Sequence, residues 1–283
     1  MQTSARQNYP AGVPHEIHPE QYRSLPHMFD EAFGRYKDRP FSVCMERWMS
    51  YGELDTLSKA MGAWLQSQGL APGARVAIML PNVPQFAVTM CAVLRAGYTC
   101  VNVNPLYTAR ELEHQLKDSG ATAIVILENF AATLEQVIER TPVKHVVMTA
   151  MGDLLGGLYG AWITVAVRHL AKMVPPYKLP LSDGRTVTPF KQAIAEGRGR
   201  TLGPDQSTLD SIAFLQYTGG TTGLRHEQRG EVDRLELRVH QQRIEQGVHR
   251  WQHVEGPLLQ HRDELVEVAR VRNQRHVRAL ADH

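Results

Sequence analysis

The segment 217–224 contains residue types that suit phosphate binding, because three glycines and three threonines lie between a tyrosine and a leucine. Glycine tolerates positive φ angles, so several backbone N–H groups can turn toward one ligand. The threonine hydroxyls add donors, which lets a triphosphate be held with little fixed positive charge. The candidate phosphate-binding residues are Tyr217, Thr218, Gly219, Gly220, Thr221, Thr222, Gly223 and Leu224.

The spacing in this loop differs from that of the P-loop of nucleoside triphosphatases. Three residues separate Gly219 from Gly223, where the P-loop has four, and no Lys-Ser or Lys-Thr pair follows. The structural alternative to a ligand-binding loop is a Gly/Thr turn between two strands.

The chain before this loop alternates short apolar runs with amphipathic stretches, which is typical of an α/β fold. The rhythm over 75–148 predicts a doubly wound parallel sheet flanked by helices, and two capping boxes open helices at 50–53 and 108–111. Residues 175–205 are expected to be loop-like apart from one short helix. Strands are expected at 41–45, 47–49, 75–80, 98–103, 121–127, 144–148 and 210–217, and helices at 26–36, 50–68, 84–96, 108–119, 130–140, 154–174 and 189–196.

Composition excludes several classes of protein. The 283 residues are 43% hydrophobic and 21% charged, which fits a soluble globular protein. The net charge is only +2, so no electrostatic case for nucleic acid exists. Three sparse cysteines show neither a disulfide framework nor paired metal-ligand spacing. The N-terminus has no apolar run, and the longest uncharged apolar stretch, 154–167, is shorter than the roughly 20 residues that span a bilayer. We expect a cytoplasmic protein.

The segment 225–283 has a different composition from the rest of the chain. It contains no Ser, Thr, Lys, Phe, Tyr, Met or Cys, and it holds 11 Arg, 7 His and 7 Gln. Only Ile244, Trp251 and Asn273 belong to residue types whose codons cannot begin with G or C. A G+C-rich gene read one base out of frame gives this bias, so we favour a non-homologous, out-of-frame tail. A genuine charged helical extension is the alternative, and neither metal nor nucleic-acid binding is expected of the tail.

The loop and several other strings resemble the adenylate-forming (AMP-binding) enzymes, and among them the bacterial long-chain fatty acid–CoA ligases. The resemblance covers about 9–224. Its strings are Val-Asn-Val-Asn-Pro-Leu-Tyr at 101–107, Arg-Glu-Leu-Glu-His-Gln-Leu at 110–116, Asp-Ser-Gly-Ala at 118–121 and Ala-Phe-Leu-Gln-Tyr-Thr-Gly-Gly-Thr-Thr-Gly at 213–223.

The resemblance implies the N-terminal portion of the adenylate-forming fold, with 1–24 as an N-terminal extension, 25–224 as a partial adenylation domain and 225–283 as the unrelated tail. It also implies ATP and Mg²⁺ as cofactors and fatty acid, ATP and CoA as partners. In the family the loop continues with a small residue and Lys-Gly, whereas Arg225 and His226 follow here. The family's catalytic residues lie beyond this point, so no catalytic residue and no metal ligand is assigned.

Two further expectations follow from this reading. A chain that ends in this way is expected to lack turnover and, with an exposed strand edge and apolar surface, to have low solubility or a molten state. The apolar segment 154–174, with basic residues near its end, suits peripheral contact with the inner face of a membrane as well as simple burial. The alternative function is a non-enzymatic nucleotide-binding or interaction module with a genuine helical tail.

Overall fold

The computed structural model describes residues 19–180 and 182–217, all of which lie in the first of two compact units, Met1–Thr218. Its centre is a six-stranded sheet in the order β7-β6-β5-β3-β4-β8, and every pairing is parallel. The strands are β3 (Arg75–Met79), β4 (Thr99–Asn102), β5 (Ala123–Leu127), β6 (His145–Thr149), β7 (Thr186–Pro189) and β8 (Phe214–Gln216). The predicted parallel α/β sheet is confirmed.

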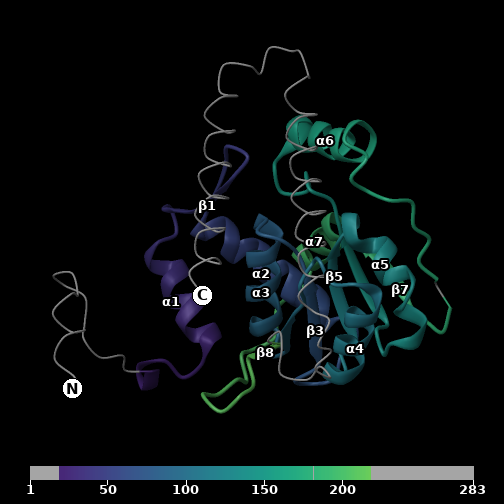
Figure 1. Cartoon of the computed structure of the whole chain (residues 1–283). Helices are drawn as coiled ribbons and strands as arrows, with labels where there is room; N and C mark the ends of the chain where they lie inside the picture. Colours follow the sequence, from purple (N-terminus) through teal and green to yellow (C-terminus); the bar gives the residue numbers. More distant parts are fainter. Residues whose placement is uncertain (1–18, 181, 218–283) are drawn as a thin grey trace, which may run out of the picture. The chain divides into compact units, whose positions relative to one another are not determined.

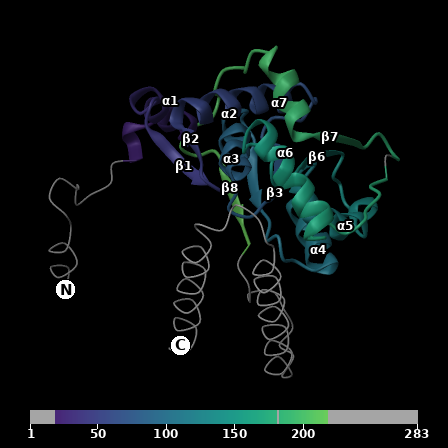
Figure 2. The ribbon, with the colours of Figure 1, turned by 90° about the horizontal axis from the view of Figure 1, so that it is seen from above.

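Helices cover both faces of this sheet (Figures 1 and 2). One face is covered by α2, α3 and α7, and the other by α4 and α5. The strands β3 to β7 follow one of the two common doubly wound orders, in which the direction of winding reverses between β3 and β5. The helices are α1 (Leu25–Arg35), α2 (Tyr51–Gln66), α3 (Pro84–Arg95), α4 (Ala109–Ser119), α5 (Ala131–Glu135), α6 (Gly157–Val165) and α7 (Phe190–Arg198).

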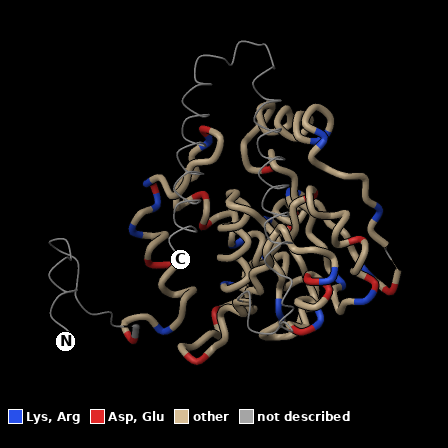
Figure 3. The backbone as a smooth tube through the Cα atoms, viewed as in Figure 1, with Lys and Arg blue, Asp and Glu red and all other residues tan. Residues whose placement is uncertain are grey.

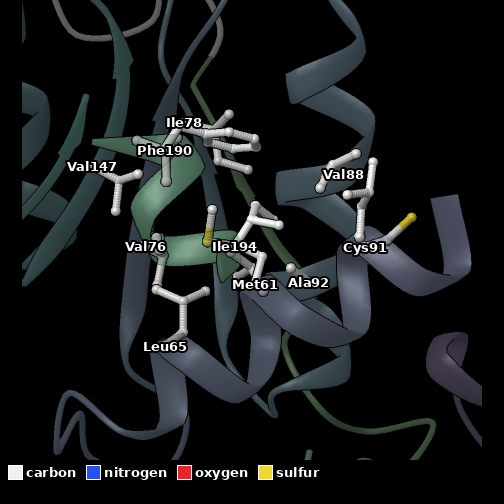
Figure 4. Packing of buried hydrophobic residues seen from close by; sticks show 14 of the residues in the cluster. Met61, Leu65, Val76, Ile78, Val88, Cys91, Ala92, Val147, Phe190 and Ile194 are labelled. Atoms are coloured by element: carbon white, nitrogen blue, oxygen red, sulfur yellow. The ribbon is translucent and has the colours of Figure 1, made fainter. Parts of the chain in front are cut away.

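The central strands are apolar on both sides because each side packs against helices. Val76 and Ile78 of β3 belong to the core under α2, α3 and α7, while Ala77 and Met79 of the same strand belong to the core under α4. Figure 4 shows the first of these cores, where Phe190 of α7 packs with residues of α2, α3 and the sheet.

An antiparallel hairpin of β1 (Pro40–Cys44) and β2 (Arg47–Ser50) precedes the sheet, as predicted. The two expected capping boxes differ in outcome. At Thr108 and Glu111 both reciprocal hydrogen bonds are present. At Ser50 only the serine bond is described, since the Glu53 carboxylate pairs instead with Arg47 at 2.7 Å.

Three expected elements differ from the structure. The predicted helix 130–140 is broken into α5 and a short 3₁₀ turn at Ile138–Arg140, because the chain leaves the helical conformation at Val137 and buries both Val137 and Ile138. The strand β7 lies in the stretch expected to be loop. It is short, lies at a sheet edge and ends at Pro189, a position that tolerates proline. The predicted helix 154–174 starts only at Gly157 and continues as a π-helical turn over Ala166–Leu170.

Candidate functional site

The candidate phosphate loop begins at the carboxyl end of β8. This strand pairs with β4 through Cys100–Phe214, Val101–Leu215 and Asn102–Gln216. Tyr217 is the last described residue, and the other seven predicted site residues, 218–224, lie outside the described residues. Loops at the carboxyl ends of parallel strands are the usual ligand-binding positions of such sheets. The structure therefore places the start of the loop at the carboxyl edge of the sheet, two strands away from the reversal point between β3 and β5.

Tyr217 is held against α4. Its hydroxyl donates a hydrogen bond of 2.5 Å to Oδ2 of Asp118. Burial, the hydrogen bond to Asp118 and the charge of that carboxylate raise the pKa of Tyr217 to about 12, while the charge of Arg75 acts in the opposite direction. The phenol therefore remains protonated at neutral pH and continues to donate. This bond joins the end of β8 to α4.

Three of the sequence strings that carried the resemblance, 101–107, 110–116 and 213–223, meet near this tyrosine. The Asn102 amide of β4 donates a 2.9 Å hydrogen bond to Oε1 of Gln216 on β8. The backbone carbonyl of Asn102 accepts a 2.8 Å bond from Nε2 of Gln115 on α4. These amide groups are polar without carrying a net charge. Their hydrogen bonds connect β4, β8 and α4 next to the start of the loop.

Two buried polar pairs at the same edge of the sheet were not predicted from the sequence. Gln85, at the start of α3, donates to Thr149 Oγ1 and to the carbonyl of Ala150. At the end of β5, the buried carboxylate of Glu128 accepts hydrogen bonds from Nε and Nη2 of Arg168 at 2.6–3.0 Å. A polar residue inside an apolar run, as Gln85 is, was the only sequence signal for the first pair.

Two hollows in the described structure lie at the opposite, amino edge of the sheet. The larger, about 1140 Å³, is lined by Tyr22, Leu25, Tyr98 and the segments 206–209 and 211–213, among others. The smaller, about 350 Å³, lies against 69–75 and Lys144. Neither of these two is lined by Tyr217.

Within 19–180 and 182–217, no group of three or more His, Cys, Asp or Glu side chains is arranged to hold a metal ion. In the same ranges, no helix has the length and apolar character needed to cross a bilayer.

Comparison with known proteins identifies the family. The family model described as "AMP-binding enzyme" matches residues 29–225. The long-chain-fatty-acid–CoA ligase of Escherichia coli O157:H7 is 46% identical over 217 residues, which are 76% of this chain and 38% of that protein. The long-chain-fatty-acid–CoA ligase of Yersinia pestis is 44% identical over 263 residues, which are 92% of this chain and 44% of that protein. The chain belongs to the AMP-binding enzyme family, and it spans 38–44% of the length of these two relatives.

The extent of these matches bears on the two parts of the chain. Because 92% of the chain is more than its first 224 residues, the Yersinia alignment also takes in part of 225–283. The out-of-frame origin of that segment stays a prediction. Among solved structures, a long-chain-fatty-acid–CoA ligase from Archaeoglobus fulgidus has a TM-score of 0.51 at 22% identity, covering 76% of this chain and 38% of that structure. That likeness supports the shared fold.

Proposed function

We propose that this chain is the N-terminal part of a long-chain fatty acid–CoA ligase and that 217–224 holds the phosphates of ATP. The observation that carries the proposal is the position of the loop. It starts at the carboxyl end of β8, in a chain whose residues 29–225 match the AMP-binding family. The fixed Tyr217 and the paired amides of Asn102 and Gln216 give the loop a rigid base.

The reaction proposed for the whole ligase has two steps. The fatty acid carboxylate attacks the α-phosphorus of ATP, forming an acyl-adenylate and releasing pyrophosphate. The thiol of CoA then attacks the acyl carbon and displaces AMP. The loop N–H groups and threonine hydroxyls would hold and offset the phosphate charge.

Mg²⁺ would bind to the phosphates of ATP and share in neutralising their charge. The described residues offer no three-residue ligand cluster of their own, so no described residue is assigned to the metal. The side chains that follow the loop here, Arg225 and His226, differ from the family's small residue and lysine. We therefore propose that the 283 residues bind nucleotide without completing the reaction.

Calorimetric titration of the 283-residue chain with Mg²⁺-ATP tests the binding proposal. Replacing both Thr221 and Thr222 by valine removes two hydroxyl donors and should weaken ATP binding about tenfold. Thr201→Val, at an exposed position before β8, is the matched control and should bind as the unchanged chain does. Equal affinity in all three proteins, or no ATP binding by the unchanged chain, would contradict the proposal.

The same titration bears on the alternative function. A non-enzymatic nucleotide-binding or interaction module requires ATP binding together with a folded 225–283 segment, which limited proteolysis would detect as protection. We place the protein in the cytoplasm, and we propose that it meets its fatty acid at the inner face of the membrane through 154–174.

A further inference from the structure

The smaller of the two hollows lies where three neighbouring strands of the sheet begin. Its wall includes Arg75 at the start of β3, Thr122 just before β5, and Lys144 and His145 at the start of β6. Within the described part of the chain, none of the residues that line it is acidic. Its volume of about 350 Å³ is in the range of small-molecule sites. The hollow therefore combines the size of a ligand site with positive charge.

Arg75, Thr122 and Lys144 form one row across the sheet. The backbone N–H of Thr122 donates to the carbonyl of Arg75 at 3.1 Å, and the N–H of Lys144 donates to the carbonyl of Thr122 at 2.8 Å. Neighbouring strands lie about 4.8 Å apart, so the two basic residues flank Thr122 with their backbones roughly 10 Å apart. Ala77 and Ile124, two residues further along β3 and β5, belong to the core under α4, so the row lies on that face of the sheet.

This row has donors that the described structure does not use. Oγ1 of Thr122 is buried and has no hydrogen-bond partner among the described residues. Within 19–180 and 182–217, neither Arg75 nor Lys144 forms an ion pair. Nζ of Lys144 donates one hydrogen bond of 3.2 Å to the carbonyl of Asp183, which leaves two of its three hydrogens free. A hydroxyl between two unpaired cations is an arrangement that suits an anion.

The acidic side chains near this row are already paired. Around α4 and β7, basic and acidic positions alternate along the chain (Figure 3). Asp118, at the end of α4, accepts the 2.5 Å hydrogen bond of the Tyr217 hydroxyl. The Asp183 carboxylate pairs with Arg185 at 3.0 Å. The charges of the two cations in the row are therefore not neutralised by these neighbours.

The rest of the wall is neutral. Gly120, between α4 and β5, has a φ of 65°, and a Cβ built there would lie 3.2 Å from Nη1 of Arg75. The missing side chain thus leaves room for the guanidinium. His145 carries no charge at neutral pH, because burial lowers its pKa. Leu70 and Pro72 add an apolar side to the hollow.

We propose that this hollow binds a small phosphorylated molecule, whose phosphate is held by Arg75, Thr122 and Lys144 and whose neutral part lies against Leu70 and Pro72. A guanidinium offers two parallel N–H donors to phosphate oxygens, and an ammonium group adds a compact charge. The site lies at the amino edge of the sheet, whereas the candidate ATP loop starts at the carboxyl end of β8. The inference therefore goes beyond the proposed function and does not depend on it.

Calorimetric titration of the 283-residue chain with phenyl phosphate tests this site. Arg75→Gln and Lys144→Gln should each lower the affinity about tenfold, because each removes a charged donor to the phosphate. Thr122→Val should lower it several-fold. The matched controls are Arg35→Gln and Lys37→Gln, exposed cations at the end of α1 that do not line the hollow, and both should bind as the unchanged chain does.

Two further probes separate the parts of the ligand. Benzyl alcohol, which lacks the phosphate, should not bind. Inorganic phosphate should bind through the same residues but more weakly, because it does not reach Leu70 and Pro72. Equal affinity for inorganic phosphate and phenyl phosphate would overturn the assignment of the neutral part and make free phosphate the ligand.

Other outcomes would overturn the site itself. One is the absence of phenyl phosphate binding at millimolar concentration, and another is equal affinity in all the variants. A third is weakened binding in the Thr221→Val, Thr222→Val double variant with Arg75→Gln and Lys144→Gln unaffected, which would place the anion on the candidate ATP loop. Unchanged circular dichroism of each variant shows that the fold is retained. Loss of phenyl phosphate binding in Arg75→Gln with ATP affinity unchanged would show that the two sites are separate.

Discussion

At the scale of single residues, Arg95 connects three helices. Its side chain is 3% exposed and forms ion pairs with Asp30 of α1 at 2.7 Å and Asp55 of α2 at 2.8 Å. Its guanidinium also donates to Ser58 and lies 5.3 Å from the centre of the Phe33 ring. One buried cation thus orients α1 and α2 against α3.

We predict that Arg95→Met lowers the free energy of unfolding by about 2–3 kcal/mol, toward the low end for a broken buried pair because Asp30 is half exposed and Asp55 keeps its ion pair with Lys59. Urea denaturation measures the change. The control is Lys59→Ala, since Lys59 also pairs with Asp55 but is itself half exposed, and it should cost less than about 0.5 kcal/mol. Similar losses in the two variants would show that burial of Arg95 adds nothing.

Contacts of single residues differ in how well the sequence predicts them. The capping box at Thr108 and Glu111 was predictable because both partners lie within one turn. At Ser50 only the serine half of the capping box is present, since the Glu53 carboxylate pairs with Arg47 on the strand before the helix. The ion pairs of Arg95 join side chains 40 and 65 residues apart. Pairs of that kind depend on the fold and have no local signal.

At the scale of elements, α7 and α2 approach so closely that a glycine is required between them. A Cβ built at Gly197 would overlap the backbone carbonyl of Ala60 and lie 3.2 Å from Cβ of Trp64. The contact is reinforced by a 3.0 Å hydrogen bond from Nε1 of Trp64 to Glu196. The packing of these two helices therefore requires a residue without a side chain at position 197.

Gly197→Ala is predicted to lower the free energy of unfolding by about 2–3 kcal/mol through overpacking. Helix propensity alone predicts the opposite sign, a gain of up to about 1 kcal/mol. Gly199→Ala is the control, because its Cβ would have only an ordinary contact of 3.7 Å and its φ of −83° suits alanine. Thermal unfolding of both variants decides the sign, and a stabilised Gly197→Ala protein would refute the close approach.

The elements with a strong apolar pattern in the sequence were predicted correctly. Strands such as β5, with five consecutive buried apolar residues, could be read from the sequence because both faces of a parallel sheet are covered. The predicted helix 130–140 was wrong because burial of Val137 outweighed local helical periodicity. The strand β7 carries polar and proline residues at a sheet edge, so its pairing with β6 could not be seen locally.

In the molecule as a whole, β8 is an edge strand of the described sheet. Among the described strands β8 pairs only with β4, and Leu209, Ile212 and Phe214 in and before it are 38–63% exposed. The position of β8 next to β4 could not be predicted, because more than 100 residues separate the two strands. The candidate site is also only partly predictable, because the loop was found from its glycines and threonines but its support by Asp118 and Asn102 was not.

The final prediction concerns the reaction. Adenylation requires the carboxylate and the α-phosphorus to be held together in a site that excludes water, and such positioning supplies much of the rate enhancement. The chain spans 38% of the length of its Escherichia coli relative, and Arg225 and His226 follow the loop where the resemblance implies a small residue and a lysine. We therefore expect the 283 residues to release no AMP above background from ATP, Mg²⁺ and palmitate while still binding ATP.

Sequencing the gene from codon 215 onward should reveal, in a shifted frame, a small residue and Lys-Gly after Leu224. Expression of the longer protein encoded in that shifted frame should restore AMP release. AMP release by the 283-residue chain itself, or no frame that continues the ligase, would contradict this prediction and make the tail 225–283 a genuine part of the protein.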